Sequence, residues 1–288
     1  MKLEEQGREV KRKSINIGNV FTYALLVIGL IIILFPFYIT IITSFKTTEE
    51  SAANFFAFPK SFYLENFKAV VHKANYFTYF SNSIIITIVA VLFILLFTPM
   101  CSYAISRNMN RSKYHKFVYY YLLLGIFVPF QVVMVPLVKY TGSLHLNNQF
   151  GLVLLHITFA SSQAVFLLVN YIRSVPSDLE SAALIDGCTI QGAYWKIVLP
   201  LIKPMLMTVL VLNTMWIWND FQMSLLILNK SPNTWTIPLF QYNFKSQYTF
   251  DYNMAFASYL IAMIPIIIVY ALMQKYIVSG LTQGAVKS

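Results

Sequence analysis

Charged residues are scarce in this sequence. Asp, Glu, Lys and Arg make up 11% of the 288 residues, whereas hydrophobic residues make up 58%. A soluble domain carries roughly 25% charged residues, because its surface must be solvated by water. The shortage of charge therefore excludes a water-exposed globular fold of this length and indicates a chain whose solvent is largely lipid.

Cysteine is also scarce, since only Cys101 and Cys188 occur. Two cysteines exclude a disulfide framework, and we expect both to be inert thiols. No cluster of possible ligands surrounds His156, which we expect to be a packed side chain, so no metal site is predicted. The net charge of +10 would suggest nucleic acid in a soluble chain. Here the basic residues lie between apolar runs, so no nucleic-acid partner is expected.

What the sequence does contain is a series of long apolar runs. A helix needs about 20 mainly apolar residues to cross a bilayer. The runs that meet this requirement are Ser14–Phe45, Ala74–Ser106, Phe117–Val138, Tyr140–Ile172, Pro204–Asn219 continued past Asp220 to Asn229, and Tyr252–Gln274. They lack the alternation of barrel strands, and the first is too long for the apolar part of a secretory signal, about 7–15 residues. The sequence therefore predicts an all-α membrane protein with six transmembrane helices.

The distribution of basic residues predicts the orientation of these helices. With the N-terminus inside, 14 of the 21 Lys and Arg residues fall on the inner side and 7 on the outer side. Such a bias predicts that both termini lie in the cytoplasm. We expect tails at 1–16 and 279–288, a membrane domain at 17–278, and an inner loop at 173–203 within that domain. The polar outer loop at 46–75 has room for short helices.

Prolines interrupt several of the apolar runs. Pro129 and Pro136 flank Gln131 in the third run, and each proline removes a backbone donor and tends to kink a helix. One interpretation is that both are tolerated bends in a bundle. The other is that they break a helix that lines a transport cavity, with Gln131 on the pathway.

The inner loop at 173–203 has a pattern of its own. Ser177 followed by Glu180 is a capping box, in which the two residues satisfy backbone donors at a helix N-terminus. Gly187 stands where a helix would end in a left-handed turn. Thr189 can cap a second helix, which we expect to end at Pro200. The loop is therefore predicted to form a helix, a glycine turn and a second helix.

The first loop helix is predicted to carry small side chains on one face. The residues that recur there at helical spacing are Leu179, Ala182, Ala183 and Asp186. Because so short a helix is marginal in water, we expect it to pack into the groove of a partner protein. A helix lying on lipid headgroups would instead need basic residues on its polar face, and 178–187 contain none.

The spacing of this loop resembles the signature of ABC importer permeases, which reads Glu-Ala-Ala, three residues, Gly, nine residues, Ile-x-Leu-Pro. Here Ala182-Ala183 are followed by three residues and Gly187, and after nine more by Ile197-Val198-Leu199-Pro200. Ser181 stands where the signature has glutamate, and Glu180 immediately precedes it. This departure weakens a role carried over to the carboxylate but leaves the helix–turn–helix intact.

Further segments extend the resemblance over nearly the whole chain, to the carbohydrate-uptake branch and its second maltose permease type. They are Trp218–Phe221, Thr236–Leu239, Gly280–Lys287, Asn66 and Asn82-Ser83. The resemblance implies the type I ABC importer permease fold, in a multi-pass protein of a bacterial cell membrane. It also implies a sugar or oligosaccharide as the substrate.

The resemblance further implies the partners. A second homologous permease would complete the pathway, two cytoplasmic ATPase subunits would use ATP and Mg, and an extracytoplasmic sugar-binding protein would deliver the substrate. The residues expected to couple to the ATPase are Glu180, Ser181, Ala182, Ala183, Asp186, Gly187, Ile197, Leu199 and Pro200. Because the chain lacks the phosphate-binding loop G-x-x-x-x-G-K-S/T, we expect no cofactor bound by it and no enzymatic activity of its own.

Candidate pathway residues lie mainly in the fifth run. They are Asn213, Trp216, Asn219 and Asp220, together with Gln131 of the third run. Polar groups beside a flat aromatic ring suit a hydroxylated sugar. Polar groups inside spans also serve as hydrogen bonds between helices, so both interpretations stay open. The resemblance implies that most sugar contacts lie in the partner permease.

Three other functions were weighed against this one. A permease for another solute, such as glycerol phosphate, would favour Arg or Lys along the pathway, and the predicted spans hold none. A secondary transporter would need ion-coupling acids in mid-membrane and internal repeats, and a membrane enzyme would need a catalytic cluster. Neither pattern is evident in the sequence, which therefore predicts a permease subunit of an ATP-driven sugar importer.

Overall fold

The computed structural model describes residues 17–73, 75–247 and 251–285, and every regular element in these ranges is helical. The predicted tail at 1–16 and residues 286–288 of the other tail lie outside the described residues. The elements are α1 (Ile17–Ser44), α2 (Thr48–Ala53), α3 (Glu65–Lys73), α4 (Tyr76–Asn108), α5 (Lys113–Phe127), α6 (Phe130–Ser143), α7 (Gln149–Ser174), α8 (Asp178–Ile185), α9 (Ile190–Ala193), the π-helical turn η1 (Tyr194–Val198), α10 (Leu199–Leu201), α11 (Lys203–Trp218), α12 (Gln222–Leu228), the 3-10 turn η2 (Pro232–Thr234), α13 (Ile237–Gln247) and α14 (Tyr252–Ala285).

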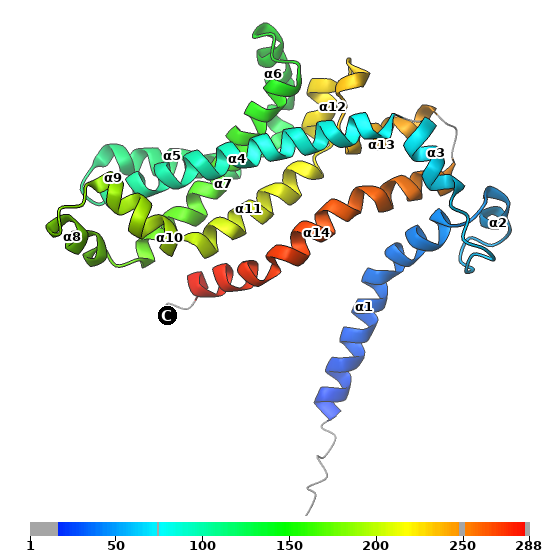
Figure 1. The fold of residues 1–288 in the computed structure, drawn as a ribbon, viewed down its shortest axis with the longest axis horizontal. Helices are drawn as coiled ribbons and strands as arrows, with labels where there is room; N and C mark the ends of the chain where they lie inside the picture. The colour runs from blue at the N-terminus through cyan, green and yellow to red at the C-terminus, as the bar shows by residue number, and fades with distance from the viewer. Residues whose placement is uncertain (1–16, 74, 248–250, 286–288) are drawn as a thin grey trace, which may run out of the picture.

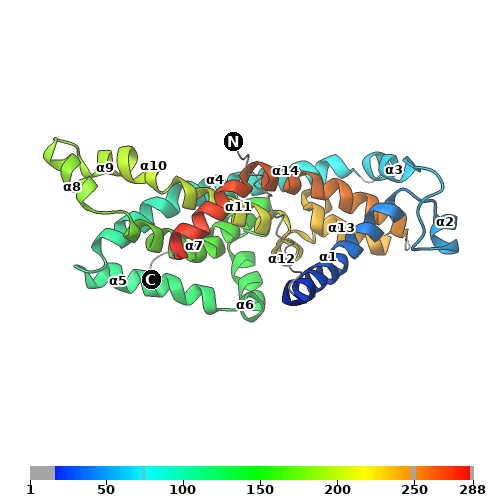
Figure 2. The same ribbon diagram turned by 90° about the horizontal axis from the view of Figure 1, so that it is seen from below.

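Long helices run along the long axis of the molecule. In Figure 1, α4, α7, α11 and α14 follow this axis, and α1 inclines away from them. The short helices α8 and α2 lie at opposite ends of the axis in both views (Figure 1, Figure 2). The predicted inner loop and the predicted outer loop are therefore at opposite ends of the helices, as two sides of a membrane require.

The prediction of six spans is confirmed if two bent helix pairs are counted as one span each. Within the described residues, four stretches are long and apolar enough to cross a membrane: Phe21–Ser44, Tyr76–Asn108, Gln149–Ser174 and Tyr252–Gln274. The bent pairs are α5 with α6, at 103°, and Ile190–Leu201 with α11, at 71°. Two of the six spans are therefore broken rather than straight.

The break between α5 and α6 occurs at one of the two prolines singled out above. Val128 has the extended backbone that a following proline imposes (φ −82°, ψ 109°), and Pro129 stands at the N-cap of α6. Pro136 lies inside α6 without ending it. Of the two interpretations left open, the helix break therefore holds for Pro129, whereas Pro136 is a tolerated proline.

The bounds predicted for two of the spans were wrong. The fifth run does not continue past Asp220, because α11 ends at Trp218 and α12 begins a new helix at Gln222. The fourth span begins at Gln149, because residues 140–143 belong to the end of α6 and residues 144–148 form the connection between the two helices. The search for charge-free runs missed these ends, because the uncharged polar residues Asn147 and Asn148 and the single carboxylate of Asp220 were counted within the runs.

The main core joins α4, α7 and α11 with the inner loop. Its fully buried side chains include Leu152, Leu168, Ile172, Val198, Ile202 and Val209. The small buried residues Ala160 and Ala164 of α7 allow α4 to approach closely. A second cluster around Trp218, Ile237 and Ala257 joins α11, α13 and α14. The loop at one end is thus packed onto the same core as the spans.

At the α2 end, side-chain amides tie distant segments together. Asn66 of α3 donates to the carbonyls of Ser44 and Lys46 at 2.8 Å, and Asn253 of α14 donates to those of Thr43 and Lys46 at 2.9 Å. The Lys46 side chain is 1% exposed and donates to two further carbonyls. Burial lowers the pKa of Lys46. The C-terminal end of α1 is thereby fixed to α3 and α14.

Replacing Asn253 by alanine should lower the free energy of unfolding by about 1–2 kcal/mol, since buried carbonyls lose their donor. Thermal unfolding of the purified protein in detergent measures this loss. Asn170→Ala is the matched control, because the exposed Asn170 amide donates only to the carbonyl of Phe166 in its own helix. Equal melting temperatures for the two variants would contradict the role given to Asn253.

Candidate functional site

The inner loop has the backbone geometry that its glycine predicts. Gly187 is in the left-handed region with φ +85°. Its N–H donates to the carbonyl of Leu184 at 3.1 Å, and the N–H of Cys188 donates to that of Ala183 at 2.9 Å. These two bonds satisfy the last carbonyls of α8. The glycine turn that separates the two loop helices is therefore confirmed.

The second loop helix starts as expected but does not end where expected. The Thr189 hydroxyl accepts a hydrogen bond from the N–H of Gly192 at 3.1 Å, so the predicted cap is confirmed. The prediction that the helix ends at Pro200 was wrong, because it passes through η1 and α10 to Leu201. The π-helical turn before Pro200 gives its ring room, since the wider turn displaces the preceding carbonyls.

The predicted capping box does not form. Ser177 has helical backbone angles (φ −68°, ψ −18°), and its side chain makes no capping hydrogen bond. The Glu180 carboxylate points away from the N-terminus of its own helix and pairs with Arg107 at the end of α4. A charge-assisted pair with a guanidinium is stronger than a bond to one backbone N–H, which explains why the long-range contact prevails.

Glu180 is held by two side chains of α4. Arg107 donates to Glu180 Oε1 from Nε at 2.9 Å and from Nη2 at 2.5 Å, and the Tyr103 hydroxyl donates to Oε2 at 2.7 Å. Arg107 Nη2 also donates to the carbonyl of Val175, at the end of α7, at 3.0 Å. Arg107 was predicted only as one of the basic residues of the inner side, and no role was predicted for Tyr103.

The other predicted coupling residues divide between the surface and the core. Those of α8 and its turn are exposed or half-buried: Ser181, Ala182, Ala183, Asp186 and Gly187. In the second helix, Pro200 is exposed, whereas Ile197 and Leu199 are half-buried. Leu199 packs against the main core. The loop thus presents a surface of small side chains on a base that is anchored in the spans.

Only some of the predicted pathway residues contact the same neighbour. Asp220 and Trp216 both lie against His156, whose side chain is 1% exposed, as expected for a packed histidine. His156 Nε2 is 3.8 Å from Asp220 Oδ2, and the His156 and Trp216 rings meet edge to face at 5.4 Å. Asn213 and Asn219 each donate instead to the carbonyl four residues earlier in α11.

Asp220 has a structural role in the fold. It accepts hydrogen bonds from the N–H of Met223 at 3.2 Å and from the N–H of Ser224 at 3.0 Å, at the start of α12. It therefore caps the helix that follows the break in the fifth run. Of the two interpretations left open for Asp220, this geometry favours the structural one.

Gln131 joins the third span to the short helix that follows the fifth. Its Nε2 donates to Gln222 Oε1 at 3.3 Å, and both side chains are at least partly accessible. The bond joins α6 to α12, which lie on the same side of the long helices in Figure 1. Gln222 was not predicted as a functional residue, because it lies in the apolar run that was interpreted as one span.

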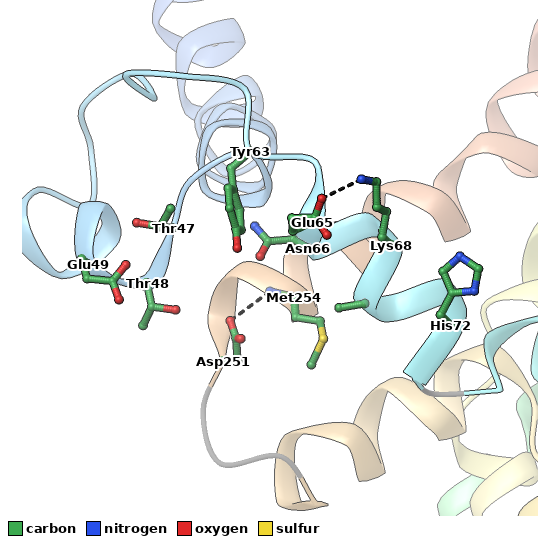
Figure 3. Close-up of a pocket in the computed structure, with 11 residues that line it drawn as sticks. Thr47, Thr48, Glu49, Tyr63, Glu65, Asn66, Lys68, His72, Asp251 and Met254 are labelled. Carbon is green, nitrogen blue, oxygen red and sulfur yellow. Dashed lines mark hydrogen bonds and ion pairs between the residues drawn. The ribbon is translucent and has the colours of Figure 1, made fainter.

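A cleft opens at the α2 end, away from the inner loop. Its volume is about 610 Å³. Figure 3 shows it between Thr48 and Glu49 of α2, Lys68 and His72 of α3, and Asp251 before α14. Lys68 pairs with Glu65 at 2.6 Å, and this hydrogen bond raises the pKa of Lys68. The cleft could not be predicted from the sequence, because one of its walls, at Asp251 and Met254, is distant in the chain from the other two.

Comparison with known proteins identifies the family. The model of the family described as "Binding-protein-dependent transport system inner membrane component" matches residues 100–283. The chain is 46% identical to the "Multiple sugar-binding transport system permease protein MsmG" of Streptococcus mutans, over 96% of this chain and 100% of that protein. It is 39% identical to the "Probable starch degradation products transport system permease protein AmyC" of Thermoanaerobacterium thermosulfurigenes, over 93% and 98%.

Solved structures agree on the fold. A chain of a bacterial ABC transporter involved in the import of the acidic polysaccharide alginate aligns with a TM-score of 0.77 at 23% identity, over 90% of this chain and 96% of that one. At this identity the match establishes the fold alone, and the all-helical permease fold predicted from the sequence is confirmed. Since the family model covers more than half of the sequence, the chain belongs to the binding-protein-dependent transport system inner membrane components.

Proposed function

We propose that this chain is a permease subunit of an ATP-driven sugar importer. The observation that carries the proposal is the exposed helix–glycine turn–helix at one end of the spans, in a chain of this transport family. An exposed loop that is rigidly packed onto the core can pass a movement of a bound partner to the spans. A rigid-body switch of this kind needs a partner that binds one state better than the other.

The assignment of a sugar as the substrate rests on the names of the relatives. The names of the relatives described above refer to multiple sugars and to starch degradation products, and the chain covers each of them almost completely. A diacetylchitobiose uptake permease of Streptomyces coelicolor is 30% identical over 91% of the chain. The common chemistry of these names is a sugar or a short oligosaccharide, which we assign to this transporter.

A second permease fits the surface that α1 leaves uncovered. Most side chains of α1 from Phe21 to Phe37 are exposed, and only the C-terminal part of the helix is buried. In Figure 1 the helix inclines away from the bundle. A span that packs on its own chain over so short a length requires lipid or another subunit along the rest. We assign part of this surface to a homologous permease that completes the pathway.

ATP and Mg are assigned to two ATPase subunits that dock on the loop around Gly187. The chain itself contains no phosphate-binding loop, so the energy of transport must come from such partners. The α8 end is then the cytoplasmic side, as the excess of basic residues in the inner segments also indicates. The α2 end, with its open cleft, faces the sugar-binding protein.

Co-purification tests this assignment. The tagged chain, expressed with its native partners and purified in mild detergent, should bring down an ATPase and a second permease. Proteoliposomes that contain this complex should take up oligosaccharide only when ATP is inside and the binding protein is outside. A stable homodimer without either partner would contradict the proposal. Uptake of glycerol phosphate in place of sugar would contradict its substrate.

A further inference from the structure

The short helix α8 has an inverted burial pattern. Its buried side chain is a carboxylate, that of Glu180, whereas Leu179, Leu184 and Ile185 are exposed, the last at 87%. Helices on soluble surfaces normally bury their apolar side chains and expose their charges. All residues of α8 are described, so the pattern is complete. The helix is therefore attached to its own chain by charge, and its apolar side chains are left for a partner.

The attachment of Glu180 lies at the junction of three helices. The Glu180 side chain is 11% exposed and that of Arg107 is 19% exposed. Arg107 holds Glu180 at the start of α8 and the carbonyl of Val175 at the end of α7, while it is itself in the last turn of α4. One guanidinium thus joins the ends of two spans to the loop helix.

The same junction continues into the core through Tyr103. Its hydroxyl donates to Glu180, and its ring lies 5.2 Å from that of Tyr194 in the π-helical turn. Tyr194 is buried in the main core. Both arms of the inner loop, α8 through Glu180 and the second helix through Tyr194, therefore meet the same tyrosine of α4.

We propose that Glu180, Arg107 and Tyr103 form a clamp that makes α8 and the end of α4 move as one body when the ATPase subunits close. Glu180 is a positioning residue in this scheme, because it faces the spans and leaves the partner surface to other side chains. The proposal rests on the proposed function above. It also assigns different roles to neighbours in the signature, since the exposed Ser181 replaces the signature glutamate and Glu180 points inward.

The physics of the clamp favours a fixed geometry over a sliding one. Arg107 and Tyr103 together make three hydrogen bonds to one carboxylate, and these bonds are directional and charge-assisted. An apolar contact between α8 and α4 could slide, because hydrophobic attraction has no preferred direction. A movement of α8 is therefore transmitted to α4 without loss as long as the carboxylate is held.

The test measures sugar molecules imported per ATP hydrolysed, using the complete complex in proteoliposomes. Glu180→Gln keeps the shape of the side chain and removes its charge. It should lower this ratio about tenfold, the equivalent of one lost charge-assisted hydrogen bond, while the ATPase still co-purifies. Tyr103→Phe removes one hydroxyl and should lower the ratio about threefold. Asn108→Ala is the matched control, because the exposed Asn108 amide at the end of α4 donates only to the carbonyl of Ala104 in its own helix and should leave the ratio unchanged.

A double variant separates the clamp from independent structural roles. If Glu180 acts through Arg107, Glu180→Gln combined with Arg107→Gln should lose no more than the worse single variant. Additive losses would overturn the clamp. If E180Q fails to assemble, Tyr103→Phe decides, and an unchanged ratio overturns the proposal. A wild-type complex without ATP-driven uptake would instead contradict the proposed function.

Discussion

Replacing Gly187 by valine should uncouple ATP hydrolysis from sugar uptake. Gly187 has φ +85°, and a β-branched residue is strongly disfavoured there. A residue other than glycine in this region costs about 1–3 kcal/mol. The loop helices would leave this turn to relieve the strain, so the docking surface on α8 would lose its fixed orientation. Because 1.4 kcal/mol is a tenfold change in an equilibrium, we expect uptake per ATP to fall roughly tenfold.

The chain provides a close control for this variant. A Cβ atom added at Gly187 would meet no atom within 4 Å, and the same is true of Gly29 in α1. Gly29 lies within the regular helix α1, so Gly29→Val adds the same side chain in similarly open surroundings without the left-handed strain. Gly29→Val should therefore retain coupled uptake, and co-purification of the second permease with this variant checks that the α1 surface is still able to bind it.

A second substitution at the same position strengthens the test. Asparagine tolerates the left-handed region better than other residues with a side chain, so Gly187→Asn should retain more coupling than Gly187→Val. The measurements are ATP hydrolysis and sugar uptake in the same proteoliposomes. Wild-type uptake per ATP in Gly187→Val would show that the turn does not determine coupling.

The backbone of the inner loop could be predicted because local residues determine it. Only a glycine adopts the left-handed turn at 187 without strain, and a threonine at 189 needs no distant partner to cap the next helix. Glu180 is different. Its local pattern predicted a capping box with Ser177, but its partner Arg107 lies 73 residues away. A single sequence does not show which distant residues pair with each other. An arginine at the end of a charge-free span is nevertheless a candidate partner for a carboxylate in the loop.

The breaks in the spans also differ in whether local residues predict them. The break at Pro129 was predictable, because proline restricts its own backbone and that of the residue before it. The break after Trp218 involves no proline, and the apolar run continues across it. One signal was present in the sequence, since Asp220 stands directly before a new apolar stretch, as an N-cap does. Within a span, however, a carboxylate also fits a group on a transport pathway, which is how Asp220 was interpreted.

Asp220→Ala should destabilise the protein by about 2–4 kcal/mol, because the first turn of α12 loses its cap and two N–H groups lose their acceptor. The Ser224 hydroxyl, 3.1 Å from Asp220 Oδ2, loses the same partner. Thermal unfolding in detergent measures the change. Asn219→Ala is the neighbouring control, since the exposed Asn219 amide donates only within α11, and it should unfold close to the wild-type temperature.

Asp220→Asn distinguishes the cap from a direct sugar contact. Asparagine is among the best N-cap residues, so this variant should recover a large part of the stability that alanine loses. If Asp220 serves the fold, uptake by the alanine and asparagine variants should follow their stability, with an unchanged KM for the sugar. A stable asparagine variant with a strongly raised KM would place the carboxylate on the substrate instead. The first outcome is favoured because the Asp220 side chain is only 8% exposed and already accepts from two backbone N–H groups and the Ser224 hydroxyl, which leaves little room for a sugar hydroxyl.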